Sequence, residues 1–110
     1  MTHVTIYRNE KKECIGFNVI GHAGYADSGE DIVCAALSVL GINTCNAIEK
    51  LTKTDFSLVT NESEGLIDFR LKDAPSKEAG LLLSAMILGI ETMAEDEDYE
   101  EYIQLLFEEV

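Results

Sequence analysis

The chain has 110 residues, of which 46% are hydrophobic. This length suits one domain over residues 1–110 and is too short for two of ordinary size. The 21 Asp and Glu residues outnumber the 8 Lys and Arg residues, so the formal net charge is -13. Such a charge repels nucleic acid and anionic membranes and favours a basic protein or peptide as partner, unless the acidic surface serves only solubility.

The cysteines are Cys14, Cys34 and Cys45, an odd number with no C-x-x-C pair. This pattern argues against a disulfide framework and a structural zinc site, and it predicts reduced thiols in the cytoplasm. The first residues lack the basic and apolar regions of a secretory signal. The run 81–90, the longest strongly apolar one that we identify, has about half the length of a membrane-spanning helix. We therefore expect a cytoplasmic protein that does not bind membranes.

The first part of the chain predicts a hairpin followed by a helix. Apolar and polar residues alternate in 2–8 and again in 14–21, which is typical of two half-buried strands. A polar loop with several glycines follows, and 32–51 then carries apolar residues at helical spacing. A second face of this helix carries only small residues and suits close packing: Cys34, Ser38, Gly41 and Cys45.

The next part predicts a second hairpin and a second helix. Residues 54–60 and 65–71 have strand character, and a Pro-Ser pair separates them from an apolar helix over 77–93. Leu81 and Leu88 lie off the main apolar face of that helix. They fit either contact with a second subunit or a central place within the fold.

The C-terminal part begins with six carboxylates in 95–101 and ends with apolar residues at helical spacing in 102–110. We interpret it as a helix with an acidic, solvated N-terminus, or alternatively as an acidic site for a basic partner. The element order predicts an α+β fold. In it, two long helices and a C-terminal helix pack on a four-stranded, mainly antiparallel sheet.

His22 and Cys34 are the candidate catalytic pair, because His22 ends a strand and Cys34 begins a helix across the same loop. A cysteine is a nucleophile as the thiolate, which a helix N-terminus and a neighbouring imidazole favour. The His would act as base and later protonate a leaving amine. Free N–H groups at the helix start would stabilise an oxyanion.

The start of this helix has two possible boundaries. Asp31 as the N-cap places Cys34 in the first turn, whereas Ser28 as the N-cap would place Cys34 deeper. We prefer Asp31. Either Asp31 or Asp27 is a candidate to orient the His22 ring.

The remaining His and Cys residues have structural interpretations. Cys14 and Cys45 suit packing, and His3 lies on an exposed strand face. No metal site is expected, because His22 and Cys34 would need two further ligands of the kind that zinc prefers.

The stretch Gly-His-Ala at 21–23, Asp-Ser-Gly-Glu-Asp-Ile-Val-Cys-Ala-Ala at 27–36 and Ser38 resembles the signature of the ribosomal-processing cysteine protease family, Prp. The length, the element order and the acidic C-terminal part are also similar. The resemblance therefore covers essentially the whole chain.

This resemblance implies a homodimeric cytoplasmic endopeptidase without a cofactor, in which Cys34 is the nucleophile and His22 the base. The implied substrate is the basic precursor of large-subunit ribosomal protein number twenty-seven, whose N-terminal extension is removed during ribosome assembly. It also implies an apolar subsite for aromatic residues and a mobile loop that orders over the substrate: Gly24, Tyr25, Ala26, Ser28, Gly29 and Glu30.

The alternative is a non-enzymatic, ribosome-associated factor that binds a basic protein through residues 95–101. In that case His22 and Cys34 would have structural roles only.

Overall fold

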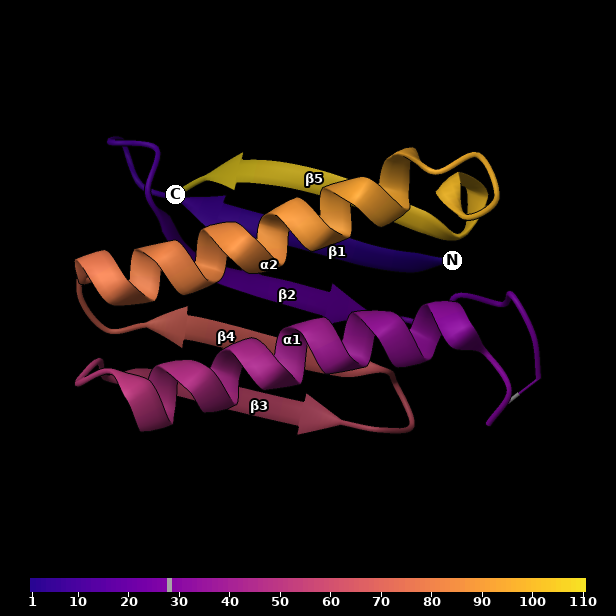
Figure 1. Cartoon of the computed structure of the whole chain (residues 1–110), viewed down its shortest axis with the longest axis horizontal. Helices are drawn as coiled ribbons and strands as arrows, with labels where there is room; N and C mark the ends of the chain where they lie inside the picture. Colours follow the sequence, from indigo (N-terminus) through magenta and orange to yellow (C-terminus); the bar gives the residue numbers. More distant parts are fainter. Residues whose placement is uncertain (28) are drawn as a thin grey trace.

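Five strands form one sheet in the computed structural model, which describes residues 1–27 and 29–110. The sheet has the spatial order β3-β4-β2-β1-β5 (Figure 1). The strands are β1 (Thr2–Arg8), β2 (Cys14–Ile20), β3 (Phe56–Asn61), β4 (Leu66–Leu71) and β5 (Ile103–Glu109). All neighbouring pairs are antiparallel except β1 and β5, which run parallel.

Two helices, α1 (Ile32–Leu51) and α2 (Lys77–Glu95), cover one face of this sheet (Figure 1). A short 3-10 helix, η1 (Glu100–Tyr102), leads into β5. The core lies between the sheet and the two helices, and its largest fully buried side chains include Phe17, Ile6, Leu37, Ile48, Phe69, Leu83 and Ile90. The α+β class, the mainly antiparallel sheet and both hairpins are as the sequence predicted.

The predicted C-terminal helix is wrong, because residues 103–109 form a fifth strand along β1. The run Ile-Gln-Leu-Leu-Phe fits both the helical period and the two-residue period of a strand. A short apolar run of this kind does not distinguish a strand from a helix. The pairing with β1 decides the outcome: all seven residues of β1, from Thr2 to Arg8, have partners on β5. Without β5 that edge of β1 would expose unpaired backbone groups. The acidic run 95–101 accordingly lies at the end of α2 and in the connection to β5, not at a helix start.

The small-residue face of α1 packs directly on the sheet. A Cβ added at Gly41 would lie 3.2 Å from the Ile67 side chain and 3.6 Å from that of Phe17. Cys45, one helical turn further along, is 1% exposed, and burial raises the pKa of its thiol to about 11. Cys14 also packs against the core. Both thiols are free, in agreement with the packing roles that the sequence predicted.

The outer surface of the helices is strongly apolar. On α2, Leu81 is 71% exposed and Leu88 is 65% exposed, so this helix is not central in the fold. On α1, Val39 is 66% exposed. By length and composition alone α1 also resembles a membrane-spanning helix, with a mean hydropathy of 1.5. It is thus a longer apolar segment than 81–90, although core helices of soluble domains meet the same criteria.

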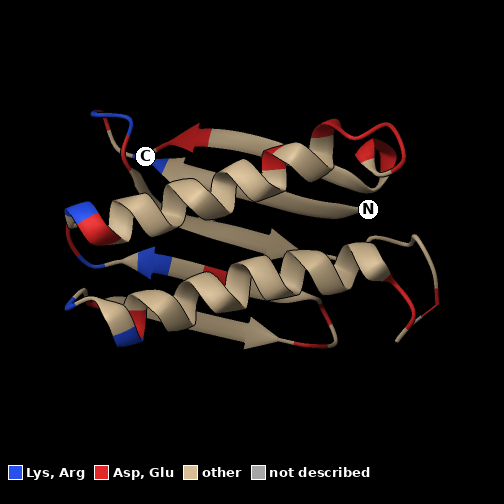
Figure 2. Ribbon diagram, viewed as in Figure 1, with Lys and Arg blue, Asp and Glu red and all other residues tan. Residues whose placement is uncertain are grey.

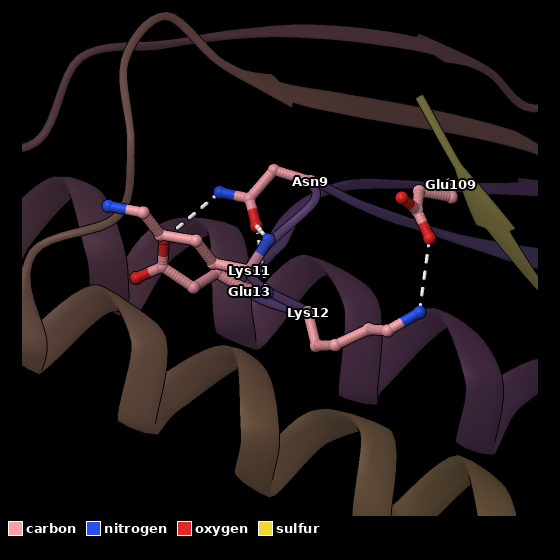
Figure 3. Close-up of polar contacts among 5 residues, drawn as sticks. All are labelled: Asn9, Lys11, Lys12, Glu13 and Glu109. Atoms are coloured by element: carbon pink, nitrogen blue, oxygen red, sulfur yellow. Dashed lines mark hydrogen bonds and ion pairs between the residues drawn. The ribbon is translucent and has the colours of Figure 1, made fainter.

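The end of the sheet opposite to the start of α1 carries the β1–β2 turn (Figure 1), whose polar contacts are drawn in Figure 3. The Asn9 side chain accepts hydrogen bonds from the backbone N–H groups of Lys11 and Glu13 and donates one to the Glu13 carboxylate. Lys12 Nζ lies 3.0 Å from Glu109 Oε2, so an ion pair joins the turn to the end of β5. We call this region, with the loops around 52–55 and 72–76, the distal end.

Candidate active site

Cys34 lies in the first turn of α1, which Asp31 caps. Asp31 Oδ1 accepts hydrogen bonds from the backbone N–H groups of Val33 and Cys34, both at 3.0 Å. The structure therefore confirms Asp31 as the N-cap. Ser28, the rival cap and a predicted loop residue, lies outside the described residues.

The second carboxylate oxygen of Asp31 holds the preceding loop. Oδ2 accepts hydrogen bonds from the N–H groups of Tyr25 at 3.0 Å and Ala26 at 3.3 Å. Burial alone would raise the Asp31 pKa, but the hydrogen bonds from Cys34, Ala26 and Tyr25 outweigh it and lower this pKa. One carboxylate thus fixes both the helix start and the loop conformation.

Three N–H groups at the start of α1, where the sequence predicted free donors, already have acceptors. Asp31 Oδ1 accepts from Val33 and Cys34, and the Asp31 backbone oxygen accepts from the N–H of Ala35 at 3.0 Å. A different amide contacts the sulfur: the N–H of Ala23 donates to Cys34 Sγ at 3.1 Å. This donor comes from the loop and stabilises negative charge at the sulfur.

His22 lies beside Cys34 in the fold, since its neighbour Ala23 contacts the sulfur. Its Nε2 atom lies 3.0 Å from the backbone oxygen of Ser63, in the β3–β4 turn. No hydrogen bond joins His22 to Cys34 among the described residues. The structure therefore brings the predicted pair to one place, and the ring contacts the turn.

The backbone around His22 is held from two sides. The N–H of Gly21 donates to the Glu64 oxygen at 2.9 Å, and Thr2 Oγ1 donates to the Gly21 oxygen at 3.3 Å. The Met1 nitrogen donates to the His22 oxygen at 3.0 Å. Two segments distant in sequence, the start of β1 and the β3–β4 turn, thus fix the end of β2.

The two Asp residues proposed to orient the ring have different surroundings. Both carboxylate oxygens of Asp31 bind backbone N–H groups of the loop and of α1. Asp27 contributes its backbone oxygen to a turn with Glu30, and in the described part of the chain its side chain makes no hydrogen bond to His22. An orienting role of Asp27 stays a prediction.

A cavity of about 760 Å³ lies over this pair of residues. His22 and Cys34 line it, together with the loop residues Gly24, Ala26 and Gly29. The remaining walls come from the start of β1, the end of β2, the middle of α1 and the β3–β4 hairpin. Its apolar part is formed by Val19, Leu37, Ile42, Leu66 and Ile67. The volume is in the range of small-molecule and peptide side-chain sites.

The Tyr25 side chain does not line the cavity but packs on the segment before β5. Its ring centroid lies 5.2 Å from that of Tyr102 and 5.8 Å from that of Tyr99. A hydrogen bond with Glu101, together with its charge, raises the pKa of Tyr102. The loop over the cavity is therefore in contact with the acidic segment.

Charge is distributed unevenly along the sheet. Figure 2 shows the Lys and Arg residues gathered at the distal end, while the site end is acidic. All of the basic residues belong to strand ends, helix ends or turns on that side: Arg8, Lys11, Lys12, Lys50, Lys53, Arg70, Lys72 and Lys77. The six carboxylates of 95–101 lie next to the loop that Tyr25 anchors.

Two contacts of the site were missed by sequence reasoning, namely Ala23 with Cys34 and Ser63 with His22. Both involve backbone atoms, so residue type carries little signal for them. As for metals, no group of three or more His, Cys, Asp or Glu side chains suited to an ion occurs within residues 1–27 and 29–110.

Comparison with known proteins identifies similar chains over nearly the full length. The family model described as cysteine protease Prp matches residues 1–104. A relative in Bacillus subtilis, named ribosomal processing cysteine protease Prp, is 29% identical over 109 residues, which is 96% of each chain. A relative of the same name in Staphylococcus aureus is 31% identical over 105 residues, or 96% of this chain and 97% of the relative.

A solved structure is also similar. It is described as the essential ribosomal processing protease Prp from S. aureus in complex with a covalently linked product peptide. The TM-score is 0.90 at 30% sequence identity, and the match covers 98% of this chain and 100% of the other.

Proposed function

This chain belongs to the Prp family of cysteine proteases, and we propose that it is an endopeptidase in which Cys34 is the nucleophile and His22 the base. One observation carries the proposal: the Cys34 sulfur accepts the Ala23 N–H beside His22, within one cavity at the start of a capped helix. Membership of a protease family also favours an enzyme over the alternative of a non-enzymatic binding factor.

The proposed reaction has two steps. Cys34 Sγ attacks the scissile carbonyl carbon while His22 takes the thiol proton; the C–N bond then breaks, and His22 returns this proton to the leaving amine. The resulting thioester is hydrolysed by water, which restores the thiol. The covalently linked product peptide in the S. aureus relative supports a covalent step, and the sequence of steps needs no metal or cofactor.

We propose that the substrate is the precursor of large-subunit ribosomal protein number twenty-seven, from which the enzyme removes an N-terminal extension. The names of the relatives support ribosomal processing. The acidic site end supports a basic substrate, because opposite charges attract over a Debye length of ~8 Å at physiological salt. The apolar part of the cavity, with Ile42 and Leu66, suits an aromatic side chain near the cut.

Replacement of the proposed nucleophile tests this function. Cys34→Ala should lower kcat for a peptide spanning the extension junction by on the order of 10³-fold or more, because no other group replaces the thiolate. Cys45→Ala is the matched control, since Cys45 lies on the same helix but is buried in the core. It should keep its activity while the protein remains folded, as shown by thermal unfolding. Full activity of Cys34→Ala would overturn the proposal.

We further propose a homodimer in the cytoplasm, without direct binding to nucleic acid or membrane. The three free cysteines suit a reducing compartment. The exposed apolar side chains of Val39, Leu81 and Leu88 suit an interface with a second copy. Leu81→Glu together with Leu88→Glu should therefore yield a monomer by light scattering, whereas an unchanged mass would exclude this surface as the interface.

A further inference from the structure

We propose that the backbone carbonyl of Ser63 is the group that orients His22, and that it leaves Nδ1 as the basic atom of the ring. This inference rests on the proposed role of His22 as the catalytic base. It assigns to the β3–β4 turn the part that a side-chain carboxylate or amide fills in other Cys–His and Ser–His sites.

The tautomer follows from the chemistry of the two atoms in contact. Nε2 of His22 lies 3.0 Å from the Ser63 oxygen. A backbone carbonyl only accepts hydrogen bonds, so Nε2 must carry the proton and donate. In the neutral ring the lone pair is then on Nδ1, and only Nδ1 is able to take the thiol proton.

The turn is held in a fixed position relative to His22. The Asn61 side chain accepts hydrogen bonds from Ser63 Oγ at 2.8 Å and from the Glu64 N–H at 3.3 Å. The Glu64 oxygen in turn accepts the Gly21 N–H at 2.9 Å. The carbonyl that meets the ring and the backbone that carries the ring therefore belong to one hydrogen-bonded unit.

Gly65 makes this unit possible. Its φ is +62°, and a Cβ at this position would lie 2.6 Å from the Gly21 oxygen. Any side chain there would be strained and would push the turn away from Gly21. The close contact between the turn and the end of β2 thus requires glycine.

The remaining polar groups near the ring are used elsewhere. Both carboxylate oxygens of Asp31 bind backbone N–H groups of the loop and of α1. The Ala23 N–H is directed at Cys34 Sγ. Ser63 is the hydrogen-bond partner of the His22 ring among the described residues.

In the proposed reaction Nδ1 takes the proton from Cys34 Sγ as the sulfur attacks, and Nε2–H stays bound to Ser63 throughout. The positive imidazolium that forms is stabilised because its Nε2–H already faces a carbonyl dipole. Nδ1 then returns the proton to the leaving amine. Ser63 acts as a positioning residue that never contacts the substrate.

The tautomer is directly measurable by long-range ¹H–¹⁵N spectra of protein labelled with ¹⁵N-histidine, which separate a protonated ring nitrogen from one with a lone pair. The measurement uses Cys34→Ala, so that no thiolate perturbs the ring, at a pH where the ring is neutral. His3→Gln identifies the signals of the other histidine. We expect the proton of His22 on Nε2, and a proton on Nδ1 would overturn the proposal.

Gly65→Ala supplies the functional test in the Cys34 enzyme. Displacement of the turn should mix the two tautomers and lower kcat by about 100-fold, with a smaller change in KM. Gly80→Ala is the matched control, because a Cβ at Gly80 on α2 meets nothing within 4 Å, so kcat should be unchanged. Unchanged kcat and tautomer in folded Gly65→Ala would contradict the proposal.

Ser63→Ala separates the carbonyl from the hydroxyl. It keeps the backbone oxygen and removes only the Ser63 Oγ contact to Asn61, so the Nε2–H tautomer should persist. Loss of that tautomer in Ser63→Ala would assign the orientation to the side chain and contradict the proposal. The tautomer measurement does not depend on the proposed function. Full activity of Cys34→Ala would show that Cys34 is not the nucleophile, but it would leave the assignment of the His22 tautomer unchanged.

Discussion

The two ends of the sheet each carry a hairpin turn and the capped start of a helix, yet they differ in what those parts contact. At the site end, Asp31 caps α1 and also binds the loop through Tyr25 and Ala26. At the distal end, the Ser76 side chain caps α2 through the Ala79 N–H at 3.1 Å, and its one other hydrogen bond among the described residues joins it to the Thr54 hydroxyl. The helix N-cap therefore has a structural role alone at the distal end, whereas at the site end it also holds the loop beside the cavity.

The site end and the distal end also differ in backbone conformation and in charge. The four glycines with positive φ all lie at the site end, whereas the distal turn uses Lys12 with φ 64° (Figure 3). The glycines permit close contact between backbones, as Gly65 does with Gly21. The basic residues gather at the distal end (Figure 2). The comparison indicates that the site end holds close backbone contacts around the cavity, whereas the distal end joins its segments through a turn and an ion pair.

Removal of the two helix caps should give the largest difference in activity between the two ends. Asp31→Ala and Ser76→Ala should each lower the free energy of unfolding by about 1 kcal/mol, since each removes an N-cap. Only Asp31→Ala should also lower kcat/KM for the junction peptide, by on the order of 10-fold or more, because the loop loses its anchor. Urea unfolding and steady-state kinetics measure the two effects. Equal activity of the two variants would remove the distinction between the ends.

Charge at the two ends gives a smaller expected contrast. Glu97→Gln with Glu100→Gln at the site end should lower kcat/KM for a basic precursor by roughly threefold at low salt, because steering weakens. The same change in charge at the distal end, Glu10→Gln with Glu49→Gln, should have less effect. High salt should remove the difference. If salt leaves kcat/KM of the unmodified enzyme unchanged, steering plays no part.

The distal ion pair gives the smallest effect. Lys12→Met keeps the apolar stem and removes the contact to Glu109, whose side chain is 55% exposed. The free energy of unfolding should change by less than about 0.5 kcal/mol, because exposed ion pairs are screened by water and salt. Peptide cleavage should be unchanged. A loss of activity here would show that the distal turn influences the site.

Local sequence signals predicted most elements. The alternation in 2–8 gives β1 with the predicted bounds, and the Asp31 cap places the start of α1 where it was expected. The bounds of β2, β3, β4 and α2 differ from the predicted ranges by only one or two residues. These features depend on neighbours in the chain, through side-chain periodicity and hydrogen bonds within one turn.

The C-terminal strand was not predictable from the same signals. Residues 103–109 have no local preference strong enough to decide between helix and strand, and the open edge of β1 decides it. The site shows the same limit. His22 and Cys34 are close in sequence and were identified together, whereas Ser63, 41 residues away, was not.

The sequence by itself determined the fold class, the two hairpins and the two long helices, and it identified His22 and Cys34 as the candidate pair. It did so because these depend on periodicity, capping and a motif within a short stretch. The tertiary structure decided that β5 completes the sheet, that Asp31 binds the loop, and that a backbone carbonyl meets His22. These contacts involve backbone groups of segments that are distant in the chain. Because almost every residue type carries the same backbone groups, the side-chain pattern does not predict such contacts.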